Sequence, residues 1–330
     1  MAHDIKDEVV VSLRTTQAVK IRCLFETLTP LLVEGTLLFD KDGMQIKGSN
    51  VISFAEINIK KKETSEISQY IYKSSLQRIV VGVSFEIVHA CLSAIGPHDS
   101  MRFELTRKGL DNFRPYLTIY VYNNDLNYEY SSHIYLLMIK HEELESPLKR
   151  FEKVVSIQSS LFLKVLRFSQ KRGSAIQIYT RNLITEEKKI HQFICFRTMG
   201  DEAELMFKQK FAGEGTKEIL KKELYSLKYL LLISKATNLS NTVEIYLQEN
   251  DILALKYRIG TVGSAIFAIA PQVEEAEDCP VLQTKVENKE NVKMKFPTVS
   301  KFKRPIKRKK RASVKSRPAN EKKKKGNKNL

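Results

Sequence analysis

The sequence has no apolar run long enough to cross a bilayer. Its longest ones, Tyr229–Ile233 and Ala265–Ala270, fall far short of the roughly 20 residues that a transmembrane helix requires. The opening MAHDIKDEVVV contains acidic residues and no apolar stretch. We therefore expect neither a membrane partner nor a secretory signal.

Cysteine and histidine are scarce and scattered. The chain has four cysteines and six histidines, with no CxxC pair and no HxxxH or HxxE spacing. This excludes a zinc site of local spacing and predicts a reduced intracellular chain with inert thiols. The residues concerned are Cys23, Cys91, Cys195 and Cys279, and His3, His89, His98, His133, His141 and His191.

Catalytic motifs are missing as well. The chain has no P-loop, no G-x-S-x-G and no kinase signature, and Gly213-Glu214-Gly215 is a lone GxG. Active sites also assemble from distant positions, so this absence weakens the enzyme interpretation without excluding it. We expect a protein that is not an enzyme and that has no catalytic residue, no metal site and no cofactor.

Excess charge is confined to one end of the chain. The formal net charge is +17, but residues 281–330 hold 19 Lys and Arg against three Asp and Glu, a net of +16. The preceding 280 residues hold 36 basic against 35 acidic residues. The body of the protein therefore meets any anionic partner through local patches rather than through its overall charge.

Strand patterns dominate the body. Leu117–Tyr122, Tyr128–Ile139, Thr242–Leu247 and Ile252–Ile259 are rich in β-branched and aromatic residues. Asp42-Gly43 predicts a hairpin turn between Leu37–Phe39 and Met44–Ile46. A calcium loop at Asp40–Gly43 is disfavoured because the later ligand positions are missing.

Four helical segments interrupt these strands, two in each half of the chain. We expect them at about 15–32, 84–95, 159–172 and 225–235. The order strand, helix, strands, helix, strands then occurs twice, which predicts a duplicated α+β unit with mostly antiparallel strands. Lys140–Arg150, charged and containing Pro147, is predicted to link the two units.

The helix at 159–172 carries the strongest functional signal. Leu161, Phe162, Val165 and Leu166 form an apolar stripe at helical spacing. Lys164, Arg167 and Lys171 recur at i, i+3 and i+7, with Arg172 beside them and no acidic residue on the helix. An unpaired basic stripe favours an anionic partner over a merely solvated helix face, although the second interpretation stays open.

Weaker basic faces occur on two other predicted helices. Lys228 and Lys235 lie seven residues apart on the last helix, and Lys20 and Arg22 lie on the first. The second helix contributes only His89. Any anionic partner of these helices would therefore meet more positive charge in the C-terminal half.

The C-terminal segment 274–330 is predicted to be a disordered basic tail, because it holds too little apolar surface to offset the entropy of ordering. Its clusters RPIKRKKR (304–311) and Lys322–Lys325 fit a nuclear-import signal or phosphate-backbone binding. The import residues are Arg304, Lys307, Arg308, Lys309, Lys310 and Arg311.

Tyr225–Val273 resembles the C-terminal signature of the eukaryotic-type DNA sliding clamps, the proliferating-cell-nuclear-antigen family. The resemblance rests on Lys235-Ala236-Thr237, Leu239-Ser240, Thr242-Val243, Tyr257-x-Ile259, Gly263 and Ala270-Pro271. Phe25–Asn50, Val81–Leu105 and Tyr135–Phe151 also resemble segments of the family, so the similarity covers about 1–273. Identity outside these segments is low enough to suggest a divergent member, and a viral one is plausible.

The resemblance implies two tandem clamp domains, 1–139 and 151–273, joined by a connecting loop at 140–150. Three identical chains would close into a ring with antiparallel sheets outside and two helices per domain lining the hole. The DNA-facing residues would be Lys20, Arg22, Lys164, Arg167, Lys171, Arg172, Lys228 and Lys235. The implied partners are double-stranded DNA, a DNA polymerase, a clamp loader and other proteins with clamp-binding peptides, with nuclear or viral-replication-site localisation and roles in DNA replication and repair.

The family also implies a groove for partner peptides. The matching positions are Phe54, Leu144, Ser146, Pro147, Phe151, Ala268, Ile269, Ala270 and Pro271. Ser146 and Ala268 are smaller than the family pattern, and Glu56 stands where an apolar residue is expected. These departures predict a shallower groove.

Three other functions remain open at this stage. A subunit of a checkpoint-type heterotrimeric clamp, which often has a C-terminal extension, is the nearest of them. A clamp-derived viral transcription factor is another. A DNA-compacting protein that acts through its basic tail belongs to a different class.

Overall fold

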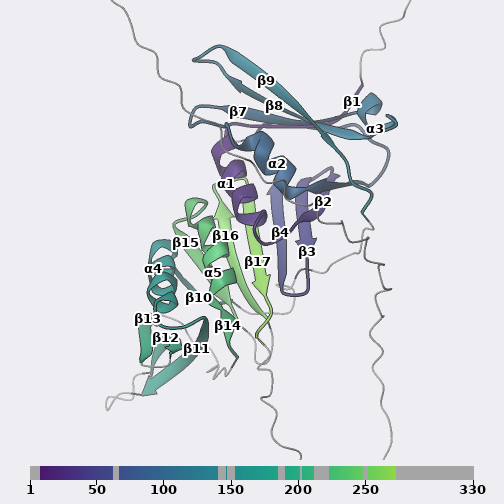
Figure 1. Cartoon of the computed structure of the whole chain (residues 1–330). Helices are drawn as coiled ribbons and strands as arrows, with labels where there is room; N and C mark the ends of the chain where they lie inside the picture. Colours follow the sequence, from purple (N-terminus) through teal and green to yellow (C-terminus); the bar gives the residue numbers. More distant parts are fainter. Residues whose placement is uncertain are drawn as a thin grey trace, which may run out of the picture. The chain divides into compact units, whose positions relative to one another are not determined.

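The computed structural model describes residues 8–61, 67–139, 146, 153–184, 190–200, 203–211, 223–247 and 252–272, all within the unit Met1–Glu275 (Figure 1). Strands account for slightly more than half of the described residues, and helices are few. The predicted α+β class is confirmed.

The described residues of the first half form nine strands and three helices. The strands are β1 (Val9–Thr15), β2 (Glu34–Asp40), β3 (Gly43–Ser49), β4 (Ser53–Lys60), β5 (Ile67–Tyr72), β6 (Arg78–Ser84), β7 (Ser100–Thr106), β8 (Tyr116–Asn123) and β9 (Tyr128–Tyr135). The helices are α1 (Ala18–Leu28), α2 (Phe85–Leu92) and the short α3 (Arg107–Leu110).

The second half repeats the order of elements. Its strands are β10 (Lys153–Gln158), β11 (Ala175–Ile184), β12 (Ile190–Met199), β13 (Glu204–Phe211), β14 (Tyr225–Ser226), β15 (Thr242–Tyr246), β16 (Leu253–Ile259) and β17 (Gly263–Ile269). Its helices are α4 (Ser159–Gln170), α5 (Leu227–Ile233) and the 3₁₀ helix η2 (Ser234–Asn238).

The strands of the described residues form three antiparallel sheets. Their orders are β5-β1-β7-β8-β9, β10-β15-β16-β17-β4-β3-β2-β6 and β13-β12-β11-β14. In the eight-stranded sheet, β17 of the second half pairs with β4 of the first, from Gly263 opposite Ile59 to Ile269 opposite Ser53. One sheet therefore runs without interruption through both halves of the described unit.

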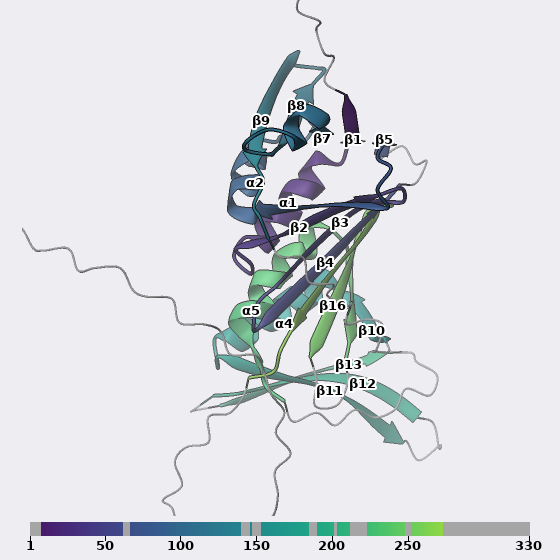
Figure 2. The ribbon, with the colours of Figure 1, turned by 90° about the vertical axis from the view of Figure 1, so that its right-hand side faces the viewer.

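The helices pack on one face of this sheet. Figures 1 and 2 show α1, α4 and α5 along the same side, and α4 contacts β10 and β15. Alternate strand residues such as Leu255, Tyr257 and Phe267 point towards the helices and belong to the main hydrophobic core. The residues between them point to the opposite face, which is called the outer face below.

The predicted helices are present, with shorter bounds. The helix expected over 15–32 covers Ala18–Leu28, because Thr15 completes β1 and Pro30 follows Thr29. The one expected over 225–235 is split into α5 and η2. The strand expected over Tyr128–Ile139 ends at Tyr135, and beyond it Leu137 makes only an isolated bridge to Gly82.

The predicted hairpin turn is confirmed. Asp40 pairs with Gly43, and Asp40 Oδ1 accepts hydrogen bonds from the backbone N–H groups of Asp42 (2.9 Å) and Gly43 (3.1 Å). Gly43 has φ of 146°, and a Cβ atom there would lie 2.1 Å from the carbonyl oxygen of Ile59. Only glycine fits this position.

Candidate nucleic-acid interface

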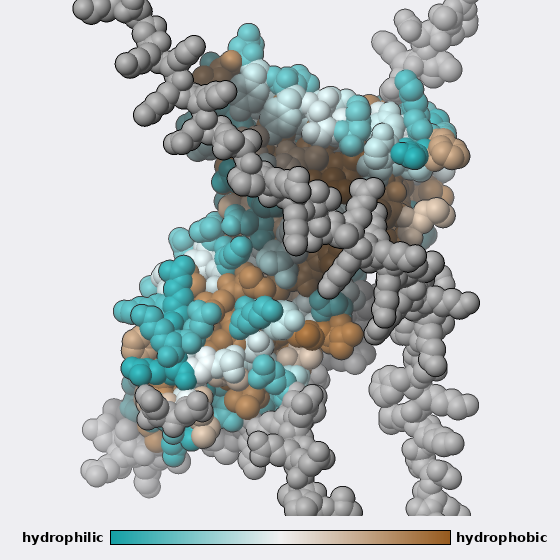
Figure 3. Space-filling view, in the orientation of Figure 1, coloured by the Kyte–Doolittle hydropathy of each residue, from teal (hydrophilic) through white to brown (hydrophobic). Residues whose placement is uncertain are grey.

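Helix α4 presents the basic stripe that its sequence predicts. Its apolar side, including Phe162, Val165 and Leu166, is buried, and this burial fixes the rotation of the helix. Lys164, Arg167 and Lys171 are exposed on the opposite side. Figure 3 shows hydrophilic side chains gathered where Figure 1 places α4.

No carboxylate neutralises this stripe within the described residues. Arg172, just beyond the helix, is exposed as well. Arg167 lies in the last turn, where the partial negative charge of the helix end favours a cation. The long side chains of the stripe therefore project their charge into solvent, on the side of the helix turned away from the sheet.

The second basic face is divided between α5 and η2. Lys228 is exposed on α5, with its Nζ 5.9 Å from the ring centre of Tyr229. Lys235 belongs to η2, whose tighter turn changes the angular spacing expected for one continuous helix. Lys235 Nζ lies 3.9 Å from Glu26 Oε1 of α1, so part of its charge is already balanced.

Helix α1 offers less free charge than its sequence suggests. Lys20 is half-buried and has other interactions. Arg22 is also half-buried, and its Nη1 donates a hydrogen bond to the carbonyl oxygen of Ile95, which follows α2. The sequence pattern did not predict this hydrogen bond, because 73 residues separate Arg22 from Ile95.

The outer face of the eight-stranded sheet carries an apolar row. The register places Tyr246, Ala254, Ala268 and Phe54 side by side on four adjacent strands. Together with Ile252 they form a small hydrophobic cluster separate from the main core. Of the predicted groove positions, Phe54 and Ala268 therefore lie on this surface.

Ile269 does not share that surface. It is 1% exposed and belongs to the main core, because neighbouring strand residues face opposite ways. Ala270 and Pro271 follow β17 and are half-buried, with Ala270 N–H donating to the carbonyl oxygen of Ile52 at 2.8 Å. Ser146 is half-buried too. Leu144, Pro147 and Phe151 lie outside the described residues, as do the predicted import residues 304–311.

Tyr246 is a member of the apolar row that sequence reasoning missed. Its hydroxyl donates a hydrogen bond of 3.0 Å to Glu244 Oε2. Burial and this carboxylate together raise the pKa of Tyr246 to about 12. The alternation of β15 was the available signal, since it places Tyr246 on the face opposite Val243 and Ile245.

A charged row runs beside the apolar one. Glu244, Lys256, Ile266, Glu56 and Lys47 are neighbours across five strands. Glu56 is 6% exposed; Lys47 Nζ lies 3.8 Å from its Oε1, while its Oε2 has no hydrogen-bond partner. The apolar row is thus bounded on this side by a buried carboxylate.

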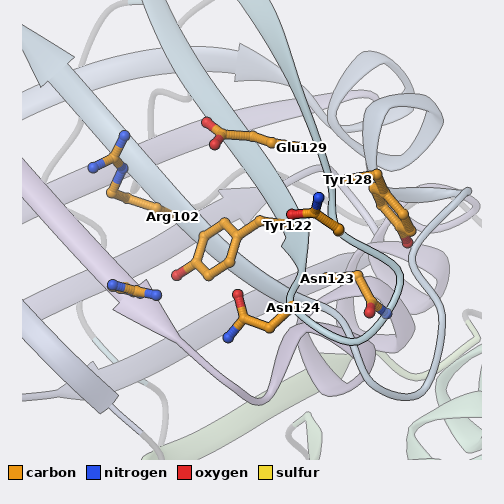
Figure 4. Close-up of a pocket in the computed structure, with 8 residues that line it drawn as sticks. Arg102, Tyr122, Asn123, Asn124, Tyr128 and Glu129 are labelled. Atoms are coloured by element: carbon orange, nitrogen blue, oxygen red, sulfur yellow. The ribbon is translucent and has the colours of Figure 1, made fainter.

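A polar hollow of about 360 Å³ opens on the five-stranded sheet and is lined by Arg14, Arg102, Tyr122, Asn123, Asn124, Asn127, Tyr128 and Glu129. Figure 4 shows Arg102, Tyr122, Asn124 and Glu129 around it. Arg14 stacks 4.5 Å from the Tyr122 ring and Arg102 4.3 Å from the Tyr120 ring, so the guanidinium groups are held by aromatic faces. No cysteine, serine, threonine or lysine lines this hollow to act as a nucleophile.

Metal binding and thiol chemistry find no support in the described ranges. No cluster of three or more His, Cys, Asp or Glu residues is present there. Burial raises the pKa of the thiols of Cys23 and Cys195, which keeps both protonated and unreactive. No helix among the described residues is long and apolar enough to cross a membrane.

Comparison with known proteins agrees with this architecture. Residues 146–272 match the model of the proliferating cell nuclear antigen C-terminal domain. The chain is 24% identical to the "Probable DNA polymerase sliding clamp 1" of Paramecium bursaria Chlorella virus 1, over 80% of this chain and 98% of the relative. It is 24% identical to the "DNA polymerase sliding clamp 2" of Sulfolobus acidocaldarius, over 80% and 100%.

The solved structures give the same fold. The crystal structure of proliferating cellular nuclear antigen from Entamoeba histolytica superposes with a TM-score of 0.64 at 16% identity, covering 80% of this chain and 100% of that one. Fold and comparisons together define a DNA sliding clamp. The chain resembles the proliferating-cell-nuclear-antigen family, through its residues 146–272 and through viral and archaeal relatives at 24% identity.

Proposed function

We propose that this protein is a processivity clamp: copies of the chain close around duplex DNA and tether a DNA polymerase and other replication or repair proteins to it. The exposed basic stripe of α4 carries the proposal. Its cations project away from the sheet, on the side where a ring lined by helices holds the duplex.

The chemistry of this stripe suits sliding. Lys164, Arg167 and Lys171 would meet phosphates, which carry no sequence information, and displace counterions. Equivalent phosphates recur along the duplex, so flexible cations exchange them without a large barrier. Retention then comes from encirclement rather than from tight binding. Lys228, Lys235, Lys20 and Arg22 would add contacts, with Arg22 limited by its bond to Ile95.

Two open sheet edges support ring closure. Strand β9 ends the five-stranded sheet and β13 ends the four-stranded one, and neither has a second partner strand in the described chain. Edge strands expose unpaired N–H and C=O groups that a neighbouring chain can complete. Pairing β9 of one copy with β13 of the next is a head-to-tail contact, the kind that closes into a ring.

The β13 edge also exposes apolar surface. A hollow of about 260 Å³ lies there, lined by Leu161, Lys164, Val165, Phe168, Leu205, Met206 and Phe207. Phe168 is 50% and Met206 40% exposed. On the other edge, α2 packs against β9 and exposes Ile87. Apolar surface at both edges fits a contact between copies, and the family resemblance favours three of them.

Partner proteins would dock on the outer face. The apolar row that contains Phe54 and Ala268 offers a floor for apolar side chains of a peptide, and the family resemblance assigns Leu144, Ser146, Pro147 and Phe151 to the same groove. Tyr246 fills part of the row and Glu56 bounds it, which favours the shallow groove. Micromolar or tighter binding of a standard clamp-binding peptide, measured by calorimetry, would contradict the shallow groove but not the clamp.

The protein would act in DNA replication, through binding rather than bond chemistry, with DNA and polymerase as partners. The tail residues 304–311 would direct it to the nucleus, or hold it at the replication site of a virus. Deleting residues 281–330 distinguishes a clamp from a protein that binds DNA through its tail. A clamp without the tail still assembles into a ring, whereas a tail-driven binder loses DNA binding altogether.

Retention on circular DNA tests the proposal directly. The purified protein is loaded onto nicked circles with a clamp loader, the circles are cut at one site, and the bound fraction is measured by gel filtration at high salt. A clamp stays on circles and leaves cut DNA. Equal retention on both forms would contradict encirclement. Native mass spectrometry of the same sample distinguishes a homotrimer from a single subunit awaiting other chains.

A further inference from the structure

The outer face carries a cationic hollow that the clamp function does not use. It has a volume of about 430 Å³ and is lined by Asn58, Lys60, Lys256, Arg258, Gly260, Thr261, Val262, Gly263 and Ser264. Three of these residues are cationic and none is acidic. We propose that this hollow binds the acidic side chains of a partner peptide.

The register explains how the cations come together. Arg258 lies opposite Ser264, which lies opposite Asn58, so these three form one row across β16, β17 and β4. Lys60 lies at the end of β4, where its N–H donates to the carbonyl oxygen of Val262 at 2.9 Å. Small residues, Gly263 and Ser264, separate Arg258 from Lys60 and leave the space between them open.

Among the described residues, the nearby carboxylates do not balance this charge. Glu244 is the acidic residue that pairs with Lys256 (3.3 Å) and also with Arg258 (3.9 Å). Lys60 is exposed and has no ion pair within the described chain. Lys256 and Arg258 thus share one carboxylate, and Arg258 keeps 73% of its side chain exposed. Charge-assisted hydrogen bonds to carboxylates would relieve the excess.

The hollow continues towards the first half of the chain. A second hollow of about 490 Å³ shares Asn58 and Lys60 and adds Lys61 and Arg78. Asp40 and Asp42 also line it, but Asp40 is engaged by the hairpin N–H groups and by Arg78 at 3.8 Å. The surface therefore suits an extended ligand with several negative charges rather than a single ion.

A peptide fits this surface better than the clamped duplex does. Lys256 and Arg258 point to the face of the sheet opposite the helices, whereas the α4 stripe points away from that sheet on the helix side. DNA held against the helices cannot reach the hollow. The apolar row lies on the same face, so a partner could place apolar residues there and acidic ones at Lys60 and Arg258.

Site-resolved acylation of the full chain tests this assignment. One probe is an acetylated hexaglutamate peptide, and the control probe is a hexaglutamine peptide extended by one glutamate. Each peptide carries on average one succinimidyl ester, which acylates lysine. Mass spectrometry gives the extent of labelling at each lysine. Dividing the labelling by the hexaglutamate probe by that of the hexaglutamine probe at the same lysine removes differences in lysine reactivity. Tail lysines appear on separate fragments. Exposed Lys108 on α3 serves as the internal reference.

We expect the ratio at Lys60 and Lys256 to exceed that at Lys108 by about tenfold, the effect of one or two charge-assisted bonds. Arg258→Ala, which keeps both lysines, should bring their ratios close to the reference, while Arg167→Ala on the helix side leaves them unchanged. Equal ratios at all three lysines would overturn the site. So would an Arg258→Ala variant that labels like the parent protein.

Duplex DNA decides between the two kinds of anionic partner. If an added duplex protects Lys60 and Lys256 from the hexaglutamate probe and Arg258→Ala abolishes that protection, the site belongs to nucleic acid and the peptide assignment is wrong. Unchanged labelling at both lysines supports the peptide. This labelling result does not depend on whether the protein encircles DNA. Labelling probes the outer face, whereas retention on circular DNA depends on the helix side of the sheet.

Discussion

Lys235 of η2 and Glu26 of α1 form an ion pair between the two halves of the chain, with 3.9 Å between Nζ and Oε1. Both side chains are more than two-fifths exposed, at 43% and 45%, so the pair adds little stability. Its main consequence is electrostatic: Glu26 withdraws part of the charge that Lys235 would otherwise offer to DNA.

Replacing Glu26 by glutamine should therefore strengthen DNA binding. We expect Glu26→Gln to raise affinity for a short duplex by about two- to fivefold at low salt, and to change unfolding free energy by less than about 0.5 kcal/mol. Fluorescence anisotropy and thermal unfolding measure the two effects. Glu86→Gln on α2 removes an exposed acid from a helix without a basic stripe and serves as the control; equal gains from both variants would point to net charge alone.

The α4 stripe makes a quantitative prediction about salt. Arg167→Ala/Lys171→Ala should weaken duplex binding for every sequence and reduce the slope of log affinity against log salt by about 2. Lys41→Ala/Lys108→Ala removes the same charge from exposed sites outside α1, α4 and α5. If the control changes the slope as much as the α4 variant does, the stripe is not the contact surface.

The β13 edge predicts a variant defective in assembly. Met206→Asp should place a charged carboxylate in the largely apolar hollow beside Phe168, so the chain should run as a monomer in native mass spectrometry with its circular dichroism unchanged. Leu126→Asp changes a side chain that is 72% exposed in the β8–β9 loop and should leave assembly intact. A Met206→Asp chain that still forms rings would rule out this edge as the contact.

Two glycines give a matched pair for stability. Gly43→Ala should cost about 2 kcal/mol or more, because its φ of 146° disfavours any side chain and the new Cβ would meet Ile59 O at 2.1 Å. Gly96→Ala meets nothing closer than Asp99 Oδ2 at 3.6 Å and should be nearly neutral. Urea unfolding of both variants measures the difference, and equal midpoints would contradict the hairpin geometry.

The cysteines predict a labelling pattern with a pH dependence. In a Cys279→Ser background, a thiol reagent at pH 8 should modify Cys91, which is half-exposed, much faster than the buried Cys23 and Cys195. Burial raises the pKa of both buried thiols, so their thiolate fraction is small at pH 8 and rises only at higher pH. Unfolding in denaturant should expose all three. Fast modification of Cys195 in the native state would contradict its burial.

Sequence patterns predicted the elements better than the orientation of their side chains. The stripe of α4 was readable because burial of Phe162, Val165 and Leu166 is periodic along one helix. Ile269, predicted as a groove residue, has its side chain in the main core, because the resemblance gives a position in the chain and not a face of the strand. Alternation along β17 carries that information once its register is known.

Contacts between distant segments lay beyond prediction from one sequence. The bond from Arg22 to Ile95 and the position of Tyr246 beside Ala268 both depend on how elements meet across the fold. The same holds for the cationic hollow, whose Lys60 and Arg258 are contributed by strands from different halves of the chain. No local pattern encodes such a meeting, because it depends on the pairing of β17 with β4.

That pairing has a mechanical consequence. A hydrogen-bonded sheet that spans both halves of a chain resists bending within its plane. A hinge between β17 and β4 would break several backbone hydrogen bonds at once. In an assembly closed through β9 and β13, the weakest joints are those between copies. A machine that opens such an assembly to admit DNA would separate one joint and leave each chain as a stiff segment.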